Sequence, residues 1–464
     1  MVTTKLPHPP WREQPQLLRR GFVDPSMMLD ELSARYGPIF GLGTGPFRLA
    51  VVGDPTALRE MFSMPVDSFR WGYRFNVLRF VVGDQSMIVS DGEPHKRRRA
   101  SVKSAFGRRS LNGWIPMIVG QTDVVVDELA MMTDADRSPI DLYRVGRRLV
   151  LYIVVRTLFG ERFAGRAAEI SELYQRPQDY IEAPLTRQLP HPFPWTARAR
   201  VRADRHALDG LIDEQIAFLR ANPSDDPRDV LARLVTDGDL SDSEIRDQVV
   251  TLIGAGFDTT SASLAWMIWR VSLTPGLWGR LRDEADDVFG PIEQHTTPDE
   301  RSLAGLTLAN ATMRETTRLH PAGVVSPREA ASDIELGGHH IPKGTLILWS
   351  AHLAGRDSGA WDEPLKFQPD RFSHLTGPQQ QLANSAWIPF GRGQRNCLGL
   401  ALAQMELTLI ISRLAQRLDI STSATGIPRP AGMVINRPAG GAPMNVSIRP
   451  TRRRSGPDLN LQST

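Results

Sequence analysis

The chain has 464 residues, of which 41% are hydrophobic and 23% are charged, and this length alone favours two or three domains. The formal net charge of +3 gives no reason to expect nucleic-acid binding. The single cysteine excludes an internal disulfide framework and is typical of a reducing cytoplasm.

The two ends of the chain carry no sign of a membrane anchor. Residues 1–24 contain no apolar run of the roughly 18 residues that span a bilayer, and no hydrophobic core of a signal peptide. We therefore expect a cytoplasmic protein without an anchor. At the other end, three consecutive arginines and the polar residues after them predict a disordered tail over 452–464.

The first half of the chain predicts a small sheet followed by many helices. Met27–Tyr36 has the pattern of a short amphipathic helix, and the apolar runs Ile39–Leu42 and Phe47–Val52 are bounded by glycines, as strands are. A proline-rich stretch over 184–195 predicts a mobile connection between two helices. Apolar stripes with helical spacing cover Leu111–Met132, Asp141–Phe159 and Ala203–Leu219.

The strongest helix signal runs from Asp242 to about Leu273. Ser241 and Glu244 have the spacing of a capping box, and Pro275 ends the run. At ~1.5 Å per residue such a helix is roughly 45–50 Å long, which is enough to cross the whole molecule.

The last hundred residues are richer in loops. Ala401–Leu418 predicts one more helix, and Gly432–Ile448 predicts terminal hairpins. No internal repeat or long linker is present, so the pattern favours a single domain over residues 1–451.

The middle of the long helix contains residues that a plain helix avoids. Gly254 and Gly256 each cost up to about 1 kcal/mol relative to alanine, and the hydroxyl of Thr259 can bond back to a carbonyl four residues earlier. A tolerated kink is one interpretation. However, Ala255 and Thr259 share a helix face. Asp258 also puts a carboxylate in an apolar helix, where its burial costs free energy, so we expect that this carboxylate has a function.

The only cysteine lies in a glycine-rich loop. A lone thiol is most often a buried, small hydrophobic side chain. Here three glycines let backbone amides approach the sulfur, and those N–H donors together with Arg395 favour the thiolate. The loop reads Phe390-Gly391-Arg392-Gly393-Gln394-Arg395-Asn396-Cys397-Leu398-Gly399.

This loop resembles the haem-binding loop of cytochrome P450 enzymes. In that family the cysteine is the axial thiolate ligand of the haem iron, a role that the resemblance carries onto Cys397. Phe390, Gly391 and Gly399 fill further positions of the haem-binding motif, and Arg395 fills the position that faces a haem propionate. The resemblance implies haem b (iron protoporphyrin IX) as the cofactor.

Two propionates call for several basic partners. His95 and Arg99 match the basic helix of the family, and Arg328 matches the arginine on the strand after Pro321. As isolated residues they would more simply be surface charges, but the matched motifs favour haem binding. Four other arginines are either solvated charges or a docking patch for an acidic ferredoxin, namely Arg97, Arg98, Arg108 and Arg109.

Two further segments resemble motifs of the family. The stretch around Asp258 and Thr259 is similar to its acid–alcohol pair, which implies that Thr259 holds dioxygen and water while Asp258 feeds protons. Glu315-Thr316-Thr317-Arg318 resembles its Glu-x-x-Arg helix, and Arg371 its third member. The implied Glu315–Arg318–Arg371 network supports the cysteine loop and takes no catalytic step.

The resemblance covers nearly the whole chain and implies the cytochrome P450 fold, which is mainly α with small β-sheets, a long central distal helix and a proximal loop with the cysteine ligand. It implies a bacterial-type haem-thiolate monooxygenase that inserts one oxygen atom from O2 into an apolar substrate. Electrons come from a separate ferredoxin and an NAD(P)H-dependent ferredoxin reductase. Oxidative coupling or epoxidation in natural-product biosynthesis is an alternative outcome. A non-catalytic haem sensor is another alternative, which the acid–alcohol pair disfavours.

The substrate itself is not identified by the sequence. By family analogy its pocket is lined by residues 70–88, 184–195 and 322–325 together with the long helix. Their composition predicts an apolar ligand, because such linings are usual in small-molecule sites. The side chains on which this prediction rests are Trp71, Phe75, Phe80, Leu252 and Val324.

Overall fold

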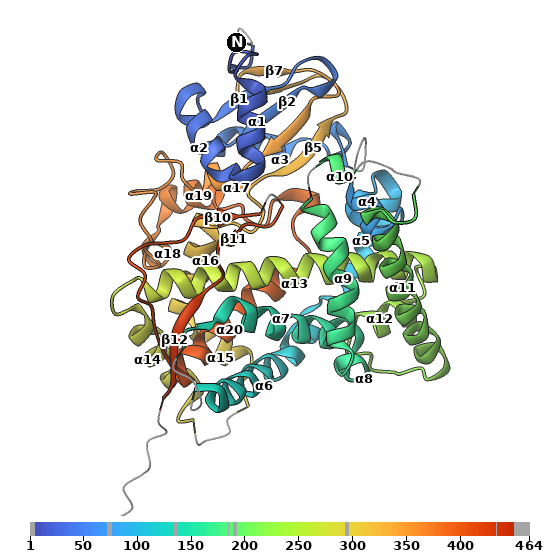
Figure 1. Cartoon of the computed structure of the whole chain (residues 1–464), viewed down its shortest axis with the longest axis vertical. Helices are drawn as coiled ribbons and strands as arrows, with labels where there is room; N and C mark the ends of the chain where they lie inside the picture. The colour runs from blue at the N-terminus through green and yellow to red at the C-terminus, as the bar shows by residue number, and fades with distance from the viewer. Residues whose placement is uncertain are drawn as a thin grey trace, which may run out of the picture.

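A computed structural model describes residues 5–71, 77–133, 138–183, 185–188, 193–292, 297–432 and 434–449. The tail predicted over 452–464 and the pocket residue Phe75 lie outside these ranges, so both stay predictions. Helices make up most of the described chain and surround one long central helix, while the strands form small sheets (Figure 1). No helix in these ranges combines the length and the apolar character that a bilayer-spanning segment requires.

The helices fall in the order that the apolar stripes predict, with ends displaced by a few residues. The α-helices are α1 (Gln14–Val23), α2 (Pro25–Tyr36), α3 (Pro55–Ser63), α4 (Val77–Val82), α5 (Gly92–Ala105), α6 (Arg108–Thr133), α7 (Leu142–Phe159), α8 (Glu161–Ala164), α9 (Ala167–Ile181), α10 (Leu185–Gln188), α11 (Ala197–Ala221), α12 (Val230–Asp237), α13 (Asp242–Ser272), α14 (Leu277–Phe289), α15 (Glu300–Gly305), α16 (Thr307–Leu319), α17 (Ala351–Ala354), α18 (Arg371–His374), α19 (Gly377–Ala386) and α20 (Leu400–Arg417). Short 3-10 turns are η1 (Gly45–Phe47), η2 (Val66–Ser68), η3 (Met87–Val89) and η4 (Gly393–Arg395).

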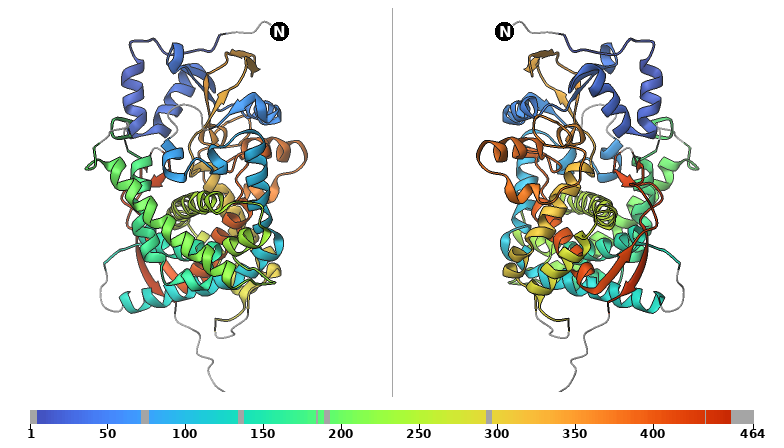
Figure 2. Two further views of the ribbon diagram at one scale, coloured as in Figure 1. Left: turned by 90° about the vertical axis from the view of Figure 1, so that its right-hand side faces the viewer. Right: turned by 90° about the vertical axis from the view of Figure 1, so that its left-hand side faces the viewer.

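The central helix α13 confirms the strongest sequence signal. The Ser241 hydroxyl accepts a hydrogen bond from the Glu244 amide, and the Glu244 carboxylate accepts one from the Ser241 amide, which is the predicted capping box. The helix crosses the molecule from side to side in Figure 1 and is seen nearly end-on in Figure 2. Because α7, α11, α16 and α20 pack around it, most of its side chains are buried.

The largest sheet has five strands in the order β1-β2-β8-β5-β3. Strand β2 begins at Leu49, two residues later than predicted, because Gly45 adopts a φ of +56° and starts the turn η1. The β2–β8 pair is parallel and the other pairs are antiparallel. The strands of this sheet are β1 (Ile39–Leu42), β2 (Leu49–Val52), β3 (Phe69–Arg70), β5 (Ser326–Ala330) and β8 (Leu346–Trp349).

The prediction of terminal hairpins was right for one pair of strands only. Strand β10 pairs with β11, but β12 pairs with β9 and β4, so its partners come from distant parts of the chain. A separate two-stranded sheet joins β6 and β7. The strands concerned are β4 (Ile140–Asp141), β6 (Ile334–Leu336), β7 (His339–Ile341), β9 (Leu418–Ser421), β10 (Pro430–Ala431), β11 (Arg437–Pro438) and β12 (Pro443–Ile448).

The proline-rich connection contains more structure than predicted. The short helix α10 lies within it, between α9 and α11, and α11 begins at Ala197 rather than at the predicted Ala203. Thr196 caps α11 through a hydrogen bond from the amide of Ala199. Its first turns were missed because arginines alternate with alanine and valine over residues 197–202, which gives no apolar stripe with helical spacing.

Candidate functional site

The cysteine loop is held in a tight turn directly before α20. The amide of Cys397 donates to the carbonyl of Phe390 at 2.7 Å, which closes the loop on itself. Gly391 and Gly393 have φ values of +64° and +72°, a conformation that other residues rarely adopt. Gly391 and Gly393 are therefore required by the backbone of this turn, whereas Gly399 has a φ of −80°, which other residues also adopt.

The surroundings of the thiol act on its charge in opposite directions. Burial has the largest effect and leaves the pKa of Cys397 above its usual value, although hydrogen bonds from the amides of Gly399 and Leu400 and the nearby charge of Arg99 act in the lowering direction. The two amides belong to the first turn of α20, whose N-terminal dipole also favours an anion. The cation whose charge lowers the pKa of Cys397 is Arg99, for which the sequence interpretation did not foresee this role. The effect of Arg395 on the thiol stays a prediction.

The four basic residues expected around haem lie close enough to influence one another. Burial and the charges of Arg395 and Arg99 lower the pKa of His95 to about 3. Burial and the charge of Arg395 lower the pKa of Arg328 to about 10. Burial also lowers the pKa of Arg395 to about 10, while Asp91, at 2.9 Å from its guanidinium, acts against this. Because Arg99, Arg328 and Arg395 have one nearby carboxylate among them, Asp91, the cluster carries more positive than negative charge.

Arg328 is the clearest case of a missing partner. Its guanidinium lies 5.0 Å from the ring centroid of Phe62, 4.8 Å from Phe69 and 5.1 Å from Trp71. The Nε atom is buried without a hydrogen-bond partner, and the side chain forms no ion pair with any residue that the structure describes. Trp71 also lies with its ring centroid 4.0 Å from the guanidinium carbon of Arg395, so it packs against this basic cluster. The role predicted for Trp71 in the lining of the substrate pocket stays a prediction.

These residues fit the cofactor that the motifs imply. A thiol that receives two backbone N–H bonds suits an iron ligand, since the thiolate is the form that binds metal. The basic cluster has a single nearby carboxylate, Asp91, and the Nε atom of Arg328 has no hydrogen-bond partner among the described residues. Such a cluster suits a ligand that carries two carboxylates. Arg99 donates to the carbonyl and the side-chain oxygen of Asn396, at 2.8 and 2.7 Å, and thereby links α5 to the cysteine loop.

The acid–alcohol segment contains the most open stretch in the middle of α13. Ala255 is exposed and Thr259 half-buried, whereas most of the surrounding helix is buried. The Thr259 hydroxyl donates to the carbonyl of Ala255 at 2.6 Å, as predicted. Gly254 serves packing, because a Cβ there would lie 1.7 Å from the hydroxyl of Tyr174 on α9. The tight contact with α9, rather than a kink alone, explains this glycine.

Asp258 is buried beside an arginine that the sequence interpretation missed. One carboxylate oxygen lies 3.0 Å from the guanidinium of Arg147 on α7, and the other has no hydrogen-bond partner among the described residues. Burial raises the pKa of Asp258, while Arg147 and Arg437 act in the opposite direction. The only sequence signal for Arg147 is that it interrupts the apolar stripe of α7.

The predicted Glu315–Arg318–Arg371 network is confirmed. Arg318 donates to both carboxylate oxygens of Glu315, at 2.7 and 2.8 Å, and Arg371 donates to Glu315 at 3.0 Å. The Glu315 and Arg318 side chains are fully buried. The same helix, α16, is tied toward the cysteine loop, because its Arg314 carbonyl accepts a hydrogen bond from Trp387, whose ring contacts that of Phe390.

The four arginines considered as a docking patch all have acidic partners. Arg97 and Arg98 both bind Glu244 at the start of α13. Arg108 lies 3.4 Å from Glu300 and Arg109 lies 3.2 Å from Asp226, and both side chains remain strongly exposed. Arg97 and Arg98 therefore have a structural task, whereas Arg108 and Arg109 keep accessible charges.

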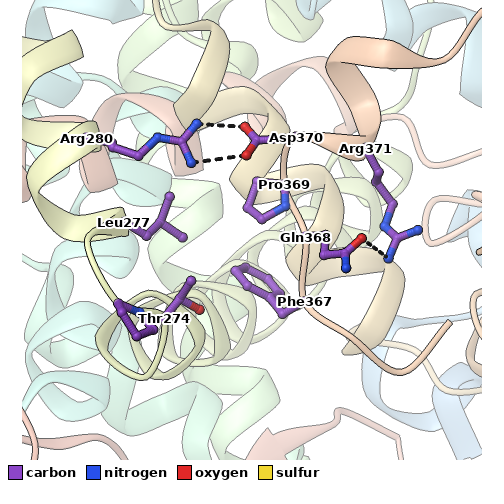
Figure 3. Close-up of a pocket in the computed structure, with 9 residues that line it drawn as sticks. Thr274, Leu277, Arg280, Phe367, Gln368, Pro369, Asp370 and Arg371 are labelled. Carbon is purple, nitrogen blue, oxygen red and sulfur yellow. Dashed lines mark hydrogen bonds and ion pairs between the residues drawn. The ribbon is translucent and has the colours of Figure 1, made fainter. Parts of the chain in front are cut away.

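Two cavities open near these elements. One, of about 230 Å³, is lined by Arg99, Lys103, Gln394 and Cys397 among others, and so lies at the cysteine loop. The other, of about 360 Å³, lies where the end of α13 meets the chain before α18 and is spanned by the Arg280–Asp370 ion pair (Figure 3). It is lined by none of the residues predicted for cofactor binding or catalysis.

The remaining pocket-lining predictions stay untested. Val324 is buried in a cluster with Leu17 and Phe40, Leu252 belongs to the main helical core, and Phe80 is partly buried on α4. These contacts confirm their apolar environment but do not identify a ligand.

Comparisons with known proteins agree with this arrangement. The family model described as Cytochrome P450 matches residues 6–441. A putative cytochrome P450 139 of Mycobacterium tuberculosis is 32% identical over 426 residues, covering 89% of this chain and 95% of the relative. A putative cytochrome P450 137 of the same species is 31% identical, covering 82% and 76%.

Two solved structures share the fold. The retinoic acid-bound cyanobacterial CYP120A1 superposes with a TM-score of 0.81 at 22% identity, covering 97% of this chain and all of the other. A zebrafish cytochrome P450 with abiraterone gives 0.74 at 25% identity, covering 92% and 100%. The mainly helical single-domain fold predicted from the sequence is thereby confirmed.

Proposed function

The chain belongs to the cytochrome P450 family of haem monooxygenases, and on that premise we propose that it oxidises an apolar organic substrate with haem b held through Cys397. The observation that carries the proposal is a thiol that accepts from two backbone N–H groups beside a cluster of basic side chains with one nearby carboxylate, Asp91. In this cluster the Arg328 guanidinium has no acidic partner among the described residues. Ferredoxin and an NAD(P)H-dependent ferredoxin reductase are the proposed source of electrons.

Each residue of the site has a proposed task in holding the cofactor. Haem bound through a thiolate supplies the activation of dioxygen, which no side chain of the protein can perform. The amides of Gly399 and Leu400 stabilise the sulfur anion, and the turn formed by Gly391 and closed by Phe390 keeps it in place. The propionate partners that we propose are His95, Arg99, Arg328 and Arg395.

Asp258 and Thr259 are proposed to deliver protons. Burial makes the carboxyl of Asp258 hold a proton more readily than an exposed one, and its free oxygen has no competing partner among the described residues. Thr259 bonds back to Ala255, which leaves its oxygen able to accept a hydrogen bond from the open side of α13. The ion pair with Arg147 orients the acid.

The proposed docking site for the ferredoxin is the surface around the cavity at the cysteine loop. Lys103 is exposed there and Arg99 lines the same cavity. Arg108 and Arg109 begin the next helix, and surface ion pairs like theirs are weak enough to be exchanged for an acidic partner. This arrangement would place the donor near the sulfur.

The test uses the ferrous–CO absorption spectrum and turnover with surrogate ferredoxin and reductase. We expect the wild type to give the red-shifted band of a thiolate-ligated haem and to consume NADPH when a substrate binds, and we expect Cys397→Ser to lose that band. Arg328→Gln should retain less haem, and Asp258→Asn should keep the spectrum while releasing more peroxide per NADPH. A protein that binds haem but consumes no oxygen with any partner or ligand would refute the proposal.

A further inference from the structure

Two arginines at the start of α11 are held side by side on one aromatic ring. The guanidinium carbon of Arg198 lies 4.0 Å from the ring centroid of Phe80 on α4, and that of Arg202 lies 5.9 Å from it. Because the two arginines are four residues apart, they share a face of α11. The structure therefore brings two like charges together where α11 meets α4.

No acidic side chain among the described residues neutralises this pair. Neither arginine forms an ion pair with any described residue, and the one hydrogen bond of Arg198 runs to the hydroxyl of Tyr180 at 3.4 Å. By contrast, Arg205 on the next turn binds both Asp209 and Asp247. Asp204, two residues after Arg202, pairs instead with Arg176 on α9. Arg198 and Arg202 therefore keep donors that match a carboxylate.

An apolar cluster adjoins the two charges. It joins α4, the end of α9 and the start of α11, with Phe80 packed at its margin. A ligand that places an anionic group on the arginines would meet the partly buried side chains at the margin of this cluster, which are Val77, Leu78 and Phe80. The buried members of the cluster are Val81, Val82, Val89, Tyr180, Ile181 and Val201.

The chain after α4 connects this cluster to the haem site described above. Ser86 hydrogen-bonds to Thr251 on α13 at 2.7 Å. Four residues later the carbonyl of Ser90 accepts a hydrogen bond from Arg395, one of the proposed propionate partners. The segment from Phe80 to Ser90 thus runs from the arginine pair along α13 to the edge of the cofactor site.

We propose that Arg198 and Arg202 bind the carboxylate of an amphipathic substrate whose apolar body lies against the α4–α9–α11 cluster and extends toward α13. The inference rests on the proposed function and narrows its substrate class from apolar compounds to apolar carboxylic acids. Phe80 holds the two guanidinium groups in position through its ring face, a contact that leaves their N–H edges available.

The experiment compares acids with their uncharged methyl esters on the haem-loaded protein. Dodecanoic acid, pyrenebutyric acid and the methyl ester of each are titrated separately into the protein. Calorimetry measures the affinity of each compound, and the shift of the haem absorption band shows whether the bound compound reaches the iron. We expect the wild type to bind at least one acid about tenfold or more tightly than its ester, the ratio that a charge-assisted contact provides. Arg198→Gln/Arg202→Gln should lose this preference without weakening the binding of the ester.

A matched control separates local binding from net charge. Arg19→Gln/Arg59→Gln removes the same charge from two exposed arginines on α1 and α3, and it should keep the preference of the wild type. Equal binding of every acid and its ester by the wild type, or a preference that survives in Arg198→Gln/Arg202→Gln, would overturn the inference. A normal ferrous–CO spectrum in the same samples would show that the proposed function survives such a failure, whereas a missing thiolate band would count against the function itself.

Discussion

Glu406 is a buried acid to which no catalytic or structural partner can be assigned. It lies on α20, nine residues after the cysteine, with 1% of its surface exposed. Its Oε1 atom has no hydrogen-bond partner among the described residues, and burial raises its pKa from 4.5 to about 8. The folded protein therefore keeps a proton that the unfolded chain releases.

The size and the sign of the effect on stability follow from this shift. A rise from 4.5 to about 8 corresponds to roughly 5 kcal/mol when both states are fully ionised, at about 1.4 kcal/mol per pKa unit. Because the folded state binds the extra proton, stability is lost as the pH rises from about 4.5 to about 8. Glutamine in place of Glu406 keeps the shape and removes the titration.

The assay is the free energy of unfolding of the haem-loaded protein in urea, measured at pH 5.5 and pH 7.5. Glu406→Gln should be more stable than the wild type at both, and its advantage should grow by about 2–3 kcal/mol between them. The exposed Glu172 supplies the control, since Glu172→Gln should show no such growth. An advantage of Glu406→Gln that does not change with pH, or that shrinks as the pH rises, would refute the reasoning.

Two further predictions concern packing around α13 and α16. Arg318→Met removes both hydrogen bonds to Glu315 and leaves that buried carboxylate with fewer partners. We expect the free energy of unfolding in urea to fall by about 3–5 kcal/mol. We also expect weaker haem retention, measured as the haem absorbance per protein. Gly254→Ala puts a Cβ 1.7 Å from the hydroxyl of Tyr174, whereas the Cβ of Gly256→Ala meets nothing closer than 3.4 Å. Gly254→Ala should therefore lower the free energy of unfolding by about 1–3 kcal/mol in the same assay, and Gly256→Ala by clearly less. Equal effects of the two substitutions would contradict the packing argument.

Features that depend on neighbouring residues could be predicted without a structure. The capping box of α13 needs only Ser241 and Glu244 three residues apart, and the bond from Thr259 to Ala255 follows from their spacing on one helix. The turn at Gly391 follows from the freedom of glycine at positive φ. In each case the interaction closes within one or two turns of chain, so the order of residues determines it.

Apart from the Glu315–Arg318–Arg371 network, which a family motif indicates, charge partners could not be predicted, because they come from distant elements. Asp258 meets Arg147, which lies more than 100 residues earlier on α7, and no local pattern selects that arginine from the others. Arg97 was considered for a docking surface, but the packing of α5 against α13 brings Glu244 to it.

The sequence by itself therefore determined the family, the long central helix and the residue types around the cysteine, since each is carried by a short motif or a periodic pattern. Only the tertiary structure decided that the charge of Arg99 acts on the thiol of Cys397, and that Arg328 has no acidic partner among the described residues. The physical reason is that burial and electrostatic interaction depend on distances through space, which the packing of helices sets.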